Sequence, residues 1–248
     1  MLNIVIPMAG SGSRFAVAGY PQPKPLIPVH GVPMIQVVIN NLRPSCAHRF
    51  IFICQRSHVA EHGLRERLSV WAPDSSIIEI DGLTEGAACT VLAARSLIDS
   101  DEPLMIANTD QYVEVDMRQY LKALEVQSLD GLIMTMTARD PKWSFVGFDE
   151  QGRVNRVVEK QVISSEATVG IYNFRRGSDF VAAADAMIFA QERVNGEFYV
   201  APVYNSMINA GQRIGVFNIG SEGSGMYGLG IPSDLELFLA HPVSQHIS

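Results

Sequence analysis

The stretch LNIVIPMAGSGSR, Leu2 to Arg14, decides the fold of this chain. Its first six residues form a near-continuous apolar run, which is typical of a β-strand buried on both faces of a parallel sheet. The small residues Ala9, Gly10 and Gly12 follow directly, and Arg14 comes next. A turn of small residues after such a strand can present a nest of backbone N–H groups, and such a nest binds phosphate.

Short apolar segments of the same kind recur through the first half of the chain and alternate with helical patterns. Strands are predicted at Leu2–Pro7, Phe50–Cys54, Ile77–Ile80 and Leu104–Ala107. Helices are predicted from Pro33 to Leu42, from about Ser57 to Trp71 and from Gly86 to Ile98. This alternation indicates parallel βαβ units and an α/β fold, a Rossmann-like, mixed but mostly parallel sheet flanked by helices.

The second half has more strands and fewer helices between them. Strands are predicted at Gly131–Ala138, Phe145–Phe148, Val154–Val158, Thr168–Phe174 and Ile214–Ile219, and helices at Ser178–Ala190, at Val200–Ala210 and from Pro232 onward. The segment DEQG, Asp149 to Gly152, has the composition of a hairpin turn. Because no linker or repeat interrupts the chain, we expect one domain over residues 1–248, with a nucleotide-binding half over about 1–130 and an acceptor-binding half over about 131–248.

The composition excludes several classes of protein. The chain has 19 Lys and Arg against 26 Asp and Glu, a net charge of −7, and it has no basic cluster of the kind that binds nucleic acid. No apolar run reaches the roughly 18 residues of a membrane span. The three cysteines lack a CxxC spacing, so we expect small core residues in a reducing, cytoplasmic setting. The composition is also compatible with a homo-oligomer of this chain.

Two segments near the N-terminus carry a more specific signal. GSGSRF, Gly10 to Phe15, is followed by PKPLIPVHGVPMI, Pro23 to Ile35, in which Lys24 lies between two prolines. A glycine turn alone is weak evidence, because many α/β folds use one for tight packing, and neither GxGxxG nor a Walker loop is present. The combination resembles the signature of the sugar-1-phosphate nucleotidyltransferase family, whose members make nucleotide-sugars from a nucleoside triphosphate and a sugar 1-phosphate.

The resemblance extends over nearly the whole chain. Further matching segments are IANTD (106–110), FVGFDEQGRVNRVVEK (145–160), ATVGIYNF (167–174), NGEFYV (195–200) and GIPSDLELF (230–238). The resemblance implies a GT-A-like nucleotidyltransferase fold with an acceptor-binding insertion. It also implies transfer of a nucleoside monophosphate to the acceptor phosphate with release of pyrophosphate, in the synthesis of cell-surface polysaccharide.

The implied reaction explains why no nucleophile–base pair stands out in the sequence. The second pKa of a phosphomonoester is about 6, so the attacking phosphate is mostly dianionic near neutral pH and needs no general base. The obstacle is repulsion between two polyanions, which is overcome by positioning and by fixed positive charge. Such a site calls for cationic side chains and for Mg²⁺, a hard cation that binds one or two carboxylates and phosphate oxygens.

The resemblance implies a role for individual residues. Arg14 would stabilise the leaving pyrophosphate, Lys24 would neutralise the α-phosphate, and Lys160 would bind the acceptor phosphate. Asp110 would hold Mg²⁺, although a strand-end aspartate is more often a helix cap or turn residue. The remaining substrate-binding candidates are Ala9, Gly10, Ser11, Gly12, Ser13, Glu85, Gly86 and Asn108 for the triphosphate, and Gly147, Glu159, Gly170 and Glu197 for the acceptor.

Two positions bear on the metal and on the base. The family commonly carries a second metal-binding aspartate where this chain has Gly228, and a threonine where it has Ile231. The second ligand is therefore missing or supplied from elsewhere. Glu85 could accept a hydrogen bond from the exocyclic amine of cytosine or guanine, which favours CTP or GTP, or it could cap the helix that follows.

Other functions remain open at this point. The acceptor could be a non-sugar phosphate, such as a polyol, choline-like or amino-acid phosphate, in a cytidylyltransferase reaction. A GT-A glycosyltransferase would have Asp-x-Asp where this chain has Asn108, Thr109 and Asp110, and would not need Arg14. A non-catalytic nucleotide-sugar sensor would not need the four charged residues intact. Trp143 and Phe145 could stack on an acceptor, although core packing is favoured.

Overall fold

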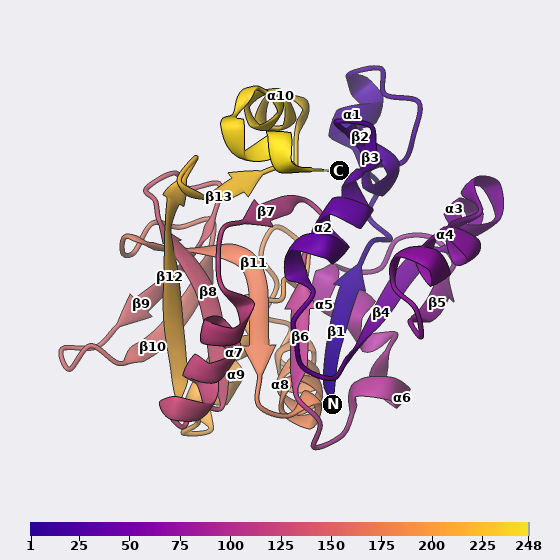
Figure 1. The fold of residues 1–248 in the computed structure, drawn as a ribbon. Coiled ribbons are helices and arrows are strands. Elements are labelled where there is room, and N and C mark those ends of the chain that lie inside the picture. The colour runs from indigo at the N-terminus through magenta and orange to yellow at the C-terminus, as the bar shows by residue number, and fades with distance from the viewer. Residues whose placement is uncertain (248) are drawn as a thin grey trace.

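The computed structural model describes residues 1–247, and one sheet of eleven strands runs through them (Figure 1). Its strands are β1 (Leu2–Pro7), β4 (His48–Gln55), β5 (Ser76–Ile80), β6 (Leu104–Ala107), β7 (Gln111–Val113), β8 (Gly131–Thr137), β9 (Ser144–Phe148), β10 (Val154–Glu159), β11 (Glu166–Phe174), β12 (Ile214–Glu222) and β13 (Gly225–Gly228). A separate two-stranded ribbon joins β2 (Pro28–Val29) to β3 (Val32–Pro33). The strand order β5-β4-β1-β6-β11-β8-β12-β13-β7 links both halves of the chain.

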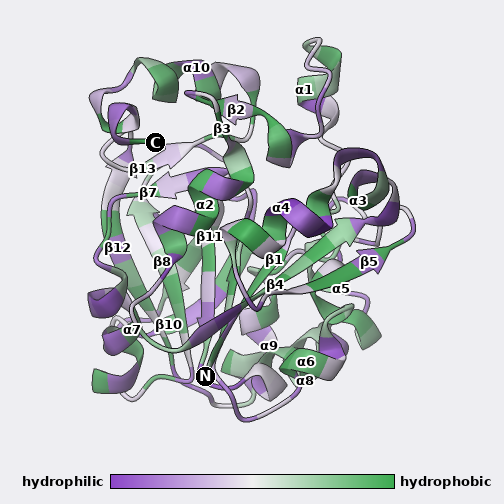
Figure 2. Cartoon of the chain, turned by 45° about the vertical axis from the view of Figure 1, so that its right-hand side comes forward, coloured by the Kyte–Doolittle hydropathy of each residue, from purple (hydrophilic) through white to green (hydrophobic). Residues whose placement is uncertain are grey.

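Helices cover both faces of this sheet. The α-helices are α1 (Ser13–Val17), α2 (Met34–Leu42), α3 (Arg56–His62), α4 (Leu64–Trp71), α5 (Ala87–Leu92), α6 (Arg95–Ile98), α7 (Met117–Val126), α8 (Gly177–Phe189), α9 (Val203–Asn209) and α10 (Pro232–Ala240), and the 3₁₀ helices are η1 (Lys24–Leu26) and η2 (Pro242–His246). Helices α2, α4 and α7 pack on one face, and α5, α6, α8 and α9 pack on the other. The strand interiors are accordingly hydrophobic (Figure 2).

The alternation of side chains along β1 explains this layering. Ile4 and Ile6 belong to the core under α2, whereas Val5 belongs to the core under α5 and α8. All three side chains are fully buried. Because successive residues of a strand point to opposite faces, an apolar run without polar interruptions requires a cover on both sides.

The direction of the strands changes where the two halves meet. In the first half β5, β4, β1 and β6 are all parallel. Strand β11 then pairs antiparallel with β6 and with β8, and β12 runs parallel to β8. The expected mixed sheet flanked by helices is confirmed, with the wholly parallel part confined to the first half of the chain.

The predicted elements agree with the structure except where a glycine or a short segment intervenes. Leu2–Pro7 and Leu104–Ala107 are strands as predicted, and in the β9–β10 hairpin turn DEQG, Gly152 N donates to the Asp149 carbonyl oxygen at 3.0 Å. The long helix expected from Ser57 to Trp71 is wrong, because Gly63 adopts φ 58° and separates α3 from α4. The segment from Gly86 to Ile98 likewise divides into α5 and α6.

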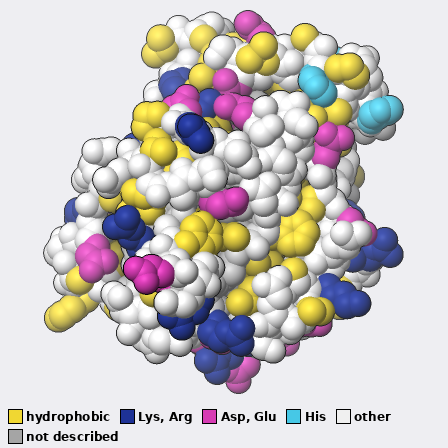
Figure 3. Space-filling view, turned by 90° about the vertical axis from the view of Figure 1, so that its left-hand side faces the viewer, with side chains coloured by type: hydrophobic (Ala, Val, Ile, Leu, Met, Phe, Trp, Pro, Cys, Tyr) yellow, Lys and Arg dark blue, Asp and Glu magenta, His cyan; other side chains and the backbone are white. Residues whose placement is uncertain are grey.

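The surface and the cysteines can be compared with the composition. Acidic and basic side chains are interspersed over the face shown in Figure 3. Within residues 1–247, no helix is both long enough and apolar enough to cross a bilayer. Cys54 is buried, and burial raises the pKa of its thiol to about 12. Cys46 is exposed, so the expectation that every cysteine lies in the core is wrong for this residue.

Candidate active site

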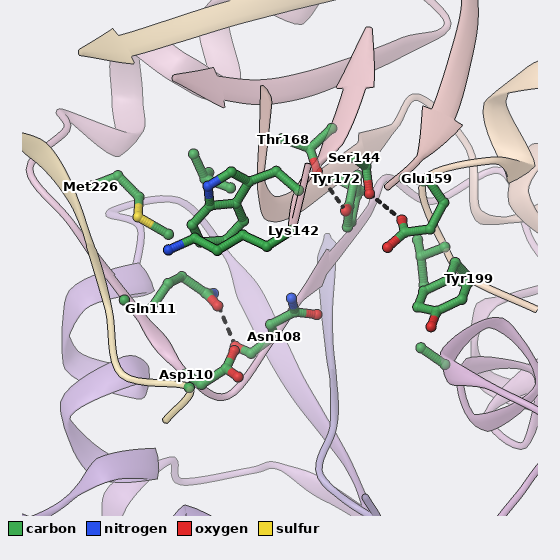
Figure 4. A pocket seen from close by; sticks show the side chains of 18 of the residues that line it. Asn108, Asp110, Gln111, Lys142, Ser144, Glu159, Thr168, Tyr172, Tyr199 and Met226 are labelled. Atoms are coloured by element: carbon green, nitrogen blue, oxygen red, sulfur yellow. Dashed lines mark hydrogen bonds between the residues drawn. The ribbon is translucent and has the colours of Figure 1, made fainter. Parts of the chain in front are cut away.

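The candidate site lies at the carboxyl ends of two neighbouring parallel strands, β1 and β6. The glycine loop follows β1, and Asn108 to Asp110 follow β6, so both reach the same edge of the sheet, where ligands bind in open α/β folds. A cavity of about 260 Å³ opens there (Figure 4). Its lining comprises Arg14, Ala87, Asn108, Asp110, Gln111, Lys142, Trp143, Ser144, Glu159, Thr168, Val169, Gly170, Tyr172, Tyr199, Val200, Ala201, Met226, Gly228, Gly230, Ile231 and Asp234.

The glycine loop lies beside this cavity and supplies Arg14 to its lining. Ala9 is anchored from behind, because Gln55 Nε2 donates to its carbonyl oxygen at 2.7 Å. Gly12 has φ 60°, and a Cβ atom there would lie 3.2 Å from Lys24 Cβ, so the turn needs a glycine. Among the described residues, no hydrogen bond uses the backbone N–H groups from Ala9 to Gly12, which leaves these donors free for an anion. Ser11 and Ser13 flank Gly12 in the same loop.

Lys24 and Asp110 form an ion pair at the floor of the site. Lys24 Nζ lies 2.7 Å from Asp110 Oδ2, and each side chain retains about one fifth of its exposure (21% and 22%). The proline-flanked η1 helix carries Lys24 toward the end of β6. The backbone of Asp110 is also held, because its carbonyl oxygen accepts from Leu229 N at 2.8 Å. The sequence places these two residues 86 positions apart, and the fold brings them into contact.

A bulge in β11 brings Gly170 against Asn108. The pairing register between β11 and β8 shifts between Thr168 and Tyr172, and Gly170 has φ 81°. A Cβ atom on Gly170 would lie 2.3 Å from Asn108 Nδ2, so only glycine fits there. Asn108 N donates to the Gly170 carbonyl at 3.0 Å. Both residues line the cavity, in keeping with the frequent occurrence of bulges beside active sites.

The opposite end of the cavity is formed where β10 ends. Glu159 lines the cavity and accepts a hydrogen bond from Ser144. Burial raises the pKa of Glu159, partly opposed by the Ser144 hydrogen bond and by the charge of Lys160. Lys160 has φ 57° and donates from Nζ to the Tyr199 hydroxyl at 3.0 Å. Lys160 is not itself in the lining, and it reaches the cavity through Tyr199.

The raised pKa of Glu159 predicts how stability depends on pH. The folded state binds this proton more tightly than the unfolded state, so the contribution to stability is present below the ordinary pKa of 4.5 and is lost as the pH rises through the raised pKa. Glu159→Gln keeps a hydrogen-bond acceptor without the buried charge. We expect the melting temperature of the variant, relative to wild type, to be higher at pH 7 than at pH 4. A difference that is the same at both pH values would contradict this explanation.

Besides the glycine loop, Lys24 and Lys160, four more candidate residues lie outside the cavity lining. Gly147 packs in the β9–β10 hairpin, where a Cβ atom would lie 2.8 Å from Arg156 Cγ. Glu85 forms an ion pair with Arg193. The N-cap residue of α5 is Gly86, and no side chain caps that helix, so Glu85 does not cap it. Gly86 contacts the chain near Phe198, whose carbonyl oxygen would lie 2.4 Å from an added Cβ. Glu197 is exposed.

Several lining residues were not assigned to the site from the sequence. The sequence favours core packing for both Trp143 and Phe145; Phe145 lies in the core, whereas Trp143 packs against the core and also lines the cavity. Lys142 forms a 2.7 Å ion pair with Glu222. Asp234, in the first turn of α10, has a pKa that burial raises. Sequence signals for these residues were weak, because they come from loops and from one helix end, and only tertiary contacts bring them together.

Comparison with known proteins identifies the family. The model of a family described as nucleotidyl transferase matches residues 4–212. The chain belongs to the nucleotidyl transferase family. A curated relative is the bifunctional protein GlmU of Cupriavidus metallidurans, 26% identical over 220 residues that make up 86% of this chain and 46% of the relative. The chain thus spans less than half the length of that relative.

Solved structures agree with this nucleotidyl transferase fold. The nucleoside-diphosphate-sugar pyrophosphorylase from Vibrio cholerae RC9 superposes with a TM-score of 0.79 at 28% identity, over 95% of this chain and 99% of that one. A glucose-1-phosphate thymidylyltransferase from Bacillus anthracis, so far assigned only putatively, superposes with a TM-score of 0.76 at 18% identity, over 100% and 97% of the two chains. The second similarity supports the fold alone.

Proposed function

We propose that this nucleotidyl transferase moves a nucleoside monophosphate from a triphosphate to the phosphate of a sugar 1-phosphate, releasing pyrophosphate and forming a nucleoside-diphosphate sugar. One observation carries the proposal: Arg14, the Lys24–Asp110 pair and the Glu159–Lys160 end of β10 are all gathered around one cavity. The pyrophosphorylase from Vibrio cholerae supports the same reaction class. We further propose that the product enters cell-surface polysaccharide synthesis in the cytoplasm.

The side chains perform this reaction mainly by positioning charge. The glycine loop binds the triphosphate through its free N–H groups, and the Arg14 guanidinium neutralises the pyrophosphate as it leaves. Lys24 lies at the α-phosphate, and Lys160 holds the acceptor phosphate from the opposite end of the cavity. Because the acceptor phosphate is already a dianion, no residue needs to remove a proton from it.

The residues present fit a magnesium ion. Among residues 1–247 no group of three ligating His, Cys, Asp or Glu side chains occurs, but Mg²⁺ is usually held by one or two carboxylates together with substrate phosphates. Asp110 Oδ2 is paired with Lys24, and its other carboxylate oxygen remains available. Gln111 Oε1 is buried in the same lining and has no hydrogen-bond partner in the described chain. When bound, the ion would supply Lewis-acid stabilisation of the α-phosphate.

The test of the proposed function is a pyrophosphate-release screen. Purified protein with MgCl₂ is incubated with CTP, GTP, UTP or dTTP, each with and without candidate acceptors. We expect pyrophosphate only when one triphosphate and one acceptor phosphate are combined, and we expect the signal to be lost with EDTA. No pyrophosphate in any combination would favour a sensor. Free nucleoside diphosphate released from a nucleotide-sugar would favour a glycosyltransferase.

A second candidate is a cytidylyltransferase that acts on a cationic, non-sugar phosphate. The acceptor end of the cavity combines the aromatic residues Trp143 and Tyr199 with the carboxylate of Glu159. Aromatic faces beside a carboxylate bind ammonium groups. The acceptor panel therefore contains phosphocholine, phosphoserine and a polyol phosphate as well as hexose 1-phosphates. Turnover only with the ammonium-bearing acceptors would favour this second candidate.

Lys160→Ala tests the acceptor end separately. We expect the KM for the acceptor phosphate to rise at least about tenfold, because a charge-assisted contact to the phosphate contributes roughly 1.5–3 kcal/mol. The KM for the triphosphate should change by less than about threefold. Steady-state kinetics with each substrate varied in turn measure both values. Unchanged acceptor kinetics would move the acceptor site away from Lys160.

A further inference from the structure

We infer that Asp234 supplies the second carboxylate of the magnesium site, in the space that a side chain at position 228 would occupy. This inference deepens the proposed function and rests on it. It concerns a residue whose helix, α10, begins after the last strand of the sheet and lies over the cavity.

The two glycines at positions 228 and 230 make room for two carboxylates. Asp234 Oδ2 lies 3.2 Å from the position that a Cβ atom on Gly228 would take. Asp110 Oδ2 lies 2.9 Å from the corresponding position on Gly230. A side chain at either glycine would crowd the neighbouring carboxylate. The two glycines therefore leave Asp110 and Asp234 on the wall of one cavity, with their oxygens beside the same short segment.

A third oxygen atom, Oε1 of Gln111, also indicates a ligand at this position. Gly228 on β13 is the direct cross-strand partner of Gln111 on β7. Side chains of directly paired residues lie on the same face of a sheet. Gln111 is 2% exposed and lines the cavity, and its Oε1 has no hydrogen-bond partner in the described chain. A buried carbonyl oxygen without a partner is costly, and a cation or its bound water would satisfy it.

The negative charge of the Asp234 carboxylate also lacks a partner. Across residues 1–247, the Asp234 carboxylate accepts no hydrogen bond and forms no ion pair within 4 Å, although Asp234 is half-buried. Lys142, whose charge acts on Asp234, is itself paired with Glu222 at 2.7 Å. The other charges that act on Asp234 are Arg14 and the like-charged Asp110. Two carboxylates facing one cavity with a single unpaired cation nearby form a site that attracts a divalent ion.

A purely structural role for Asp234 makes a different prediction. An aspartate in the first turn of a helix stabilises the helix through its dipole, with or without a metal. Asp179 occupies the same position in α8 and is paired with Arg176, away from the cavity. Asp179→Ala is therefore a matched control for the helix-end effect.

The test is a Mn²⁺ titration in which binding is measured by electron paramagnetic resonance. Free Mn²⁺ is titrated into wild type, Asp234→Ala, Asp179→Ala and the double variant Gly228→Asp/Asp234→Ala. Each titration is performed alone and with the α,β-methylene analogue of the triphosphate selected in the pyrophosphate screen. We expect Asp234→Ala to weaken Mn²⁺ binding at least about tenfold. We expect the double variant to recover to within about threefold of wild type, and Asp179→Ala to bind as wild type does.

Two results would overturn the inference. One is wild-type Mn²⁺ affinity in Asp234→Ala. The other is a double variant that is folded by circular dichroism but binds Mn²⁺ no better than Asp234→Ala, because Asp234 would then act only through α10. Failure of the proposed function is a separate outcome. If no triphosphate supports pyrophosphate release, the titration without nucleotide still measures what Asp234 contributes.

Discussion

Replacing Arg14 with alanine should lower kcat for pyrophosphate release by about 10²–10³-fold, because the variant loses one preorganised group that stabilises charge in the transition state. Arg14 is in the short helix α1 directly after the glycine loop and lines the cavity that Asp110 also lines. Its planar guanidinium can bind two phosphate oxygens at once. Single-turnover measurement of pyrophosphate release with saturating triphosphate separates this loss from weaker substrate binding.

The controls for this prediction distinguish lost charge from lost geometry. Arg14→Lys retains the charge without the fork, and we expect its kcat to lie between those of the wild type and Arg14→Ala. Arg118→Ala removes an exposed arginine that pairs with Asp116 at the start of α7, and we expect its kcat to stay within about twofold of wild type. An Arg14→Ala variant with a kcat near that of the wild type would remove Arg14 from the phosphate site.

Replacing Lys24 with alanine should lower kcat by about 10³-fold or more, because two effects add. The variant loses the cation that lies at the α-phosphate. It also leaves Asp110 with a half-buried carboxylate whose 2.7 Å partner is gone, which increases the negative charge that the triphosphate meets. The melting temperature and the rate of pyrophosphate release are both measured, since a stable but slow variant is expected.

Two further variants accompany Lys24→Ala. Lys122→Ala removes an exposed lysine on α7 and should leave kcat within about twofold of wild type. Lys24→Arg retains the charge on a longer, planar group and should recover part of the activity. If Lys24→Ala released pyrophosphate at the wild-type rate, the ion pair with Asp110 would be only structural.

The fold was predictable from sequence where an element is buried on both faces. Leu2–Pro7 and Leu104–Ala107 lie in the middle of the sheet, and their apolar runs allow no other placement. The helix α7 was missed although its signals are present, since Asp116 caps it and Met117, Tyr120 and Leu124 form its buried face. The strand β13 could not be predicted, because GMYG is short and begins and ends with glycine.

The grouping of the candidate residues was predictable where a residue belongs to a motif, and not where its position depends on tertiary contacts. Arg14, Lys24 and Asp110 come together through loops whose sequence identifies them. The position of Lys160 against Tyr199 depends on a loop 39 residues away. Asp234 lies within the matching segment GIPSDLELF, but its proposed role depends on the absence of a side chain at Gly228. The sequence does not show that the Asp234 carboxylate lies beside Gly228, because the three-dimensional fold brings them together.

The most direct measurement is a crystal structure of the protein with MgCl₂, the α,β-methylene analogue of its triphosphate and the acceptor phosphate. We predict that the α-phosphate lies between Arg14 and Lys24 and that Asp110 holds the metal. We also predict that the acceptor phosphate lies on the side of Lys160, with both phosphates at the carboxyl ends of β1 and β6. Phosphates bound elsewhere, or Arg14, Lys24 and Asp110 all without contact to them, would contradict the account.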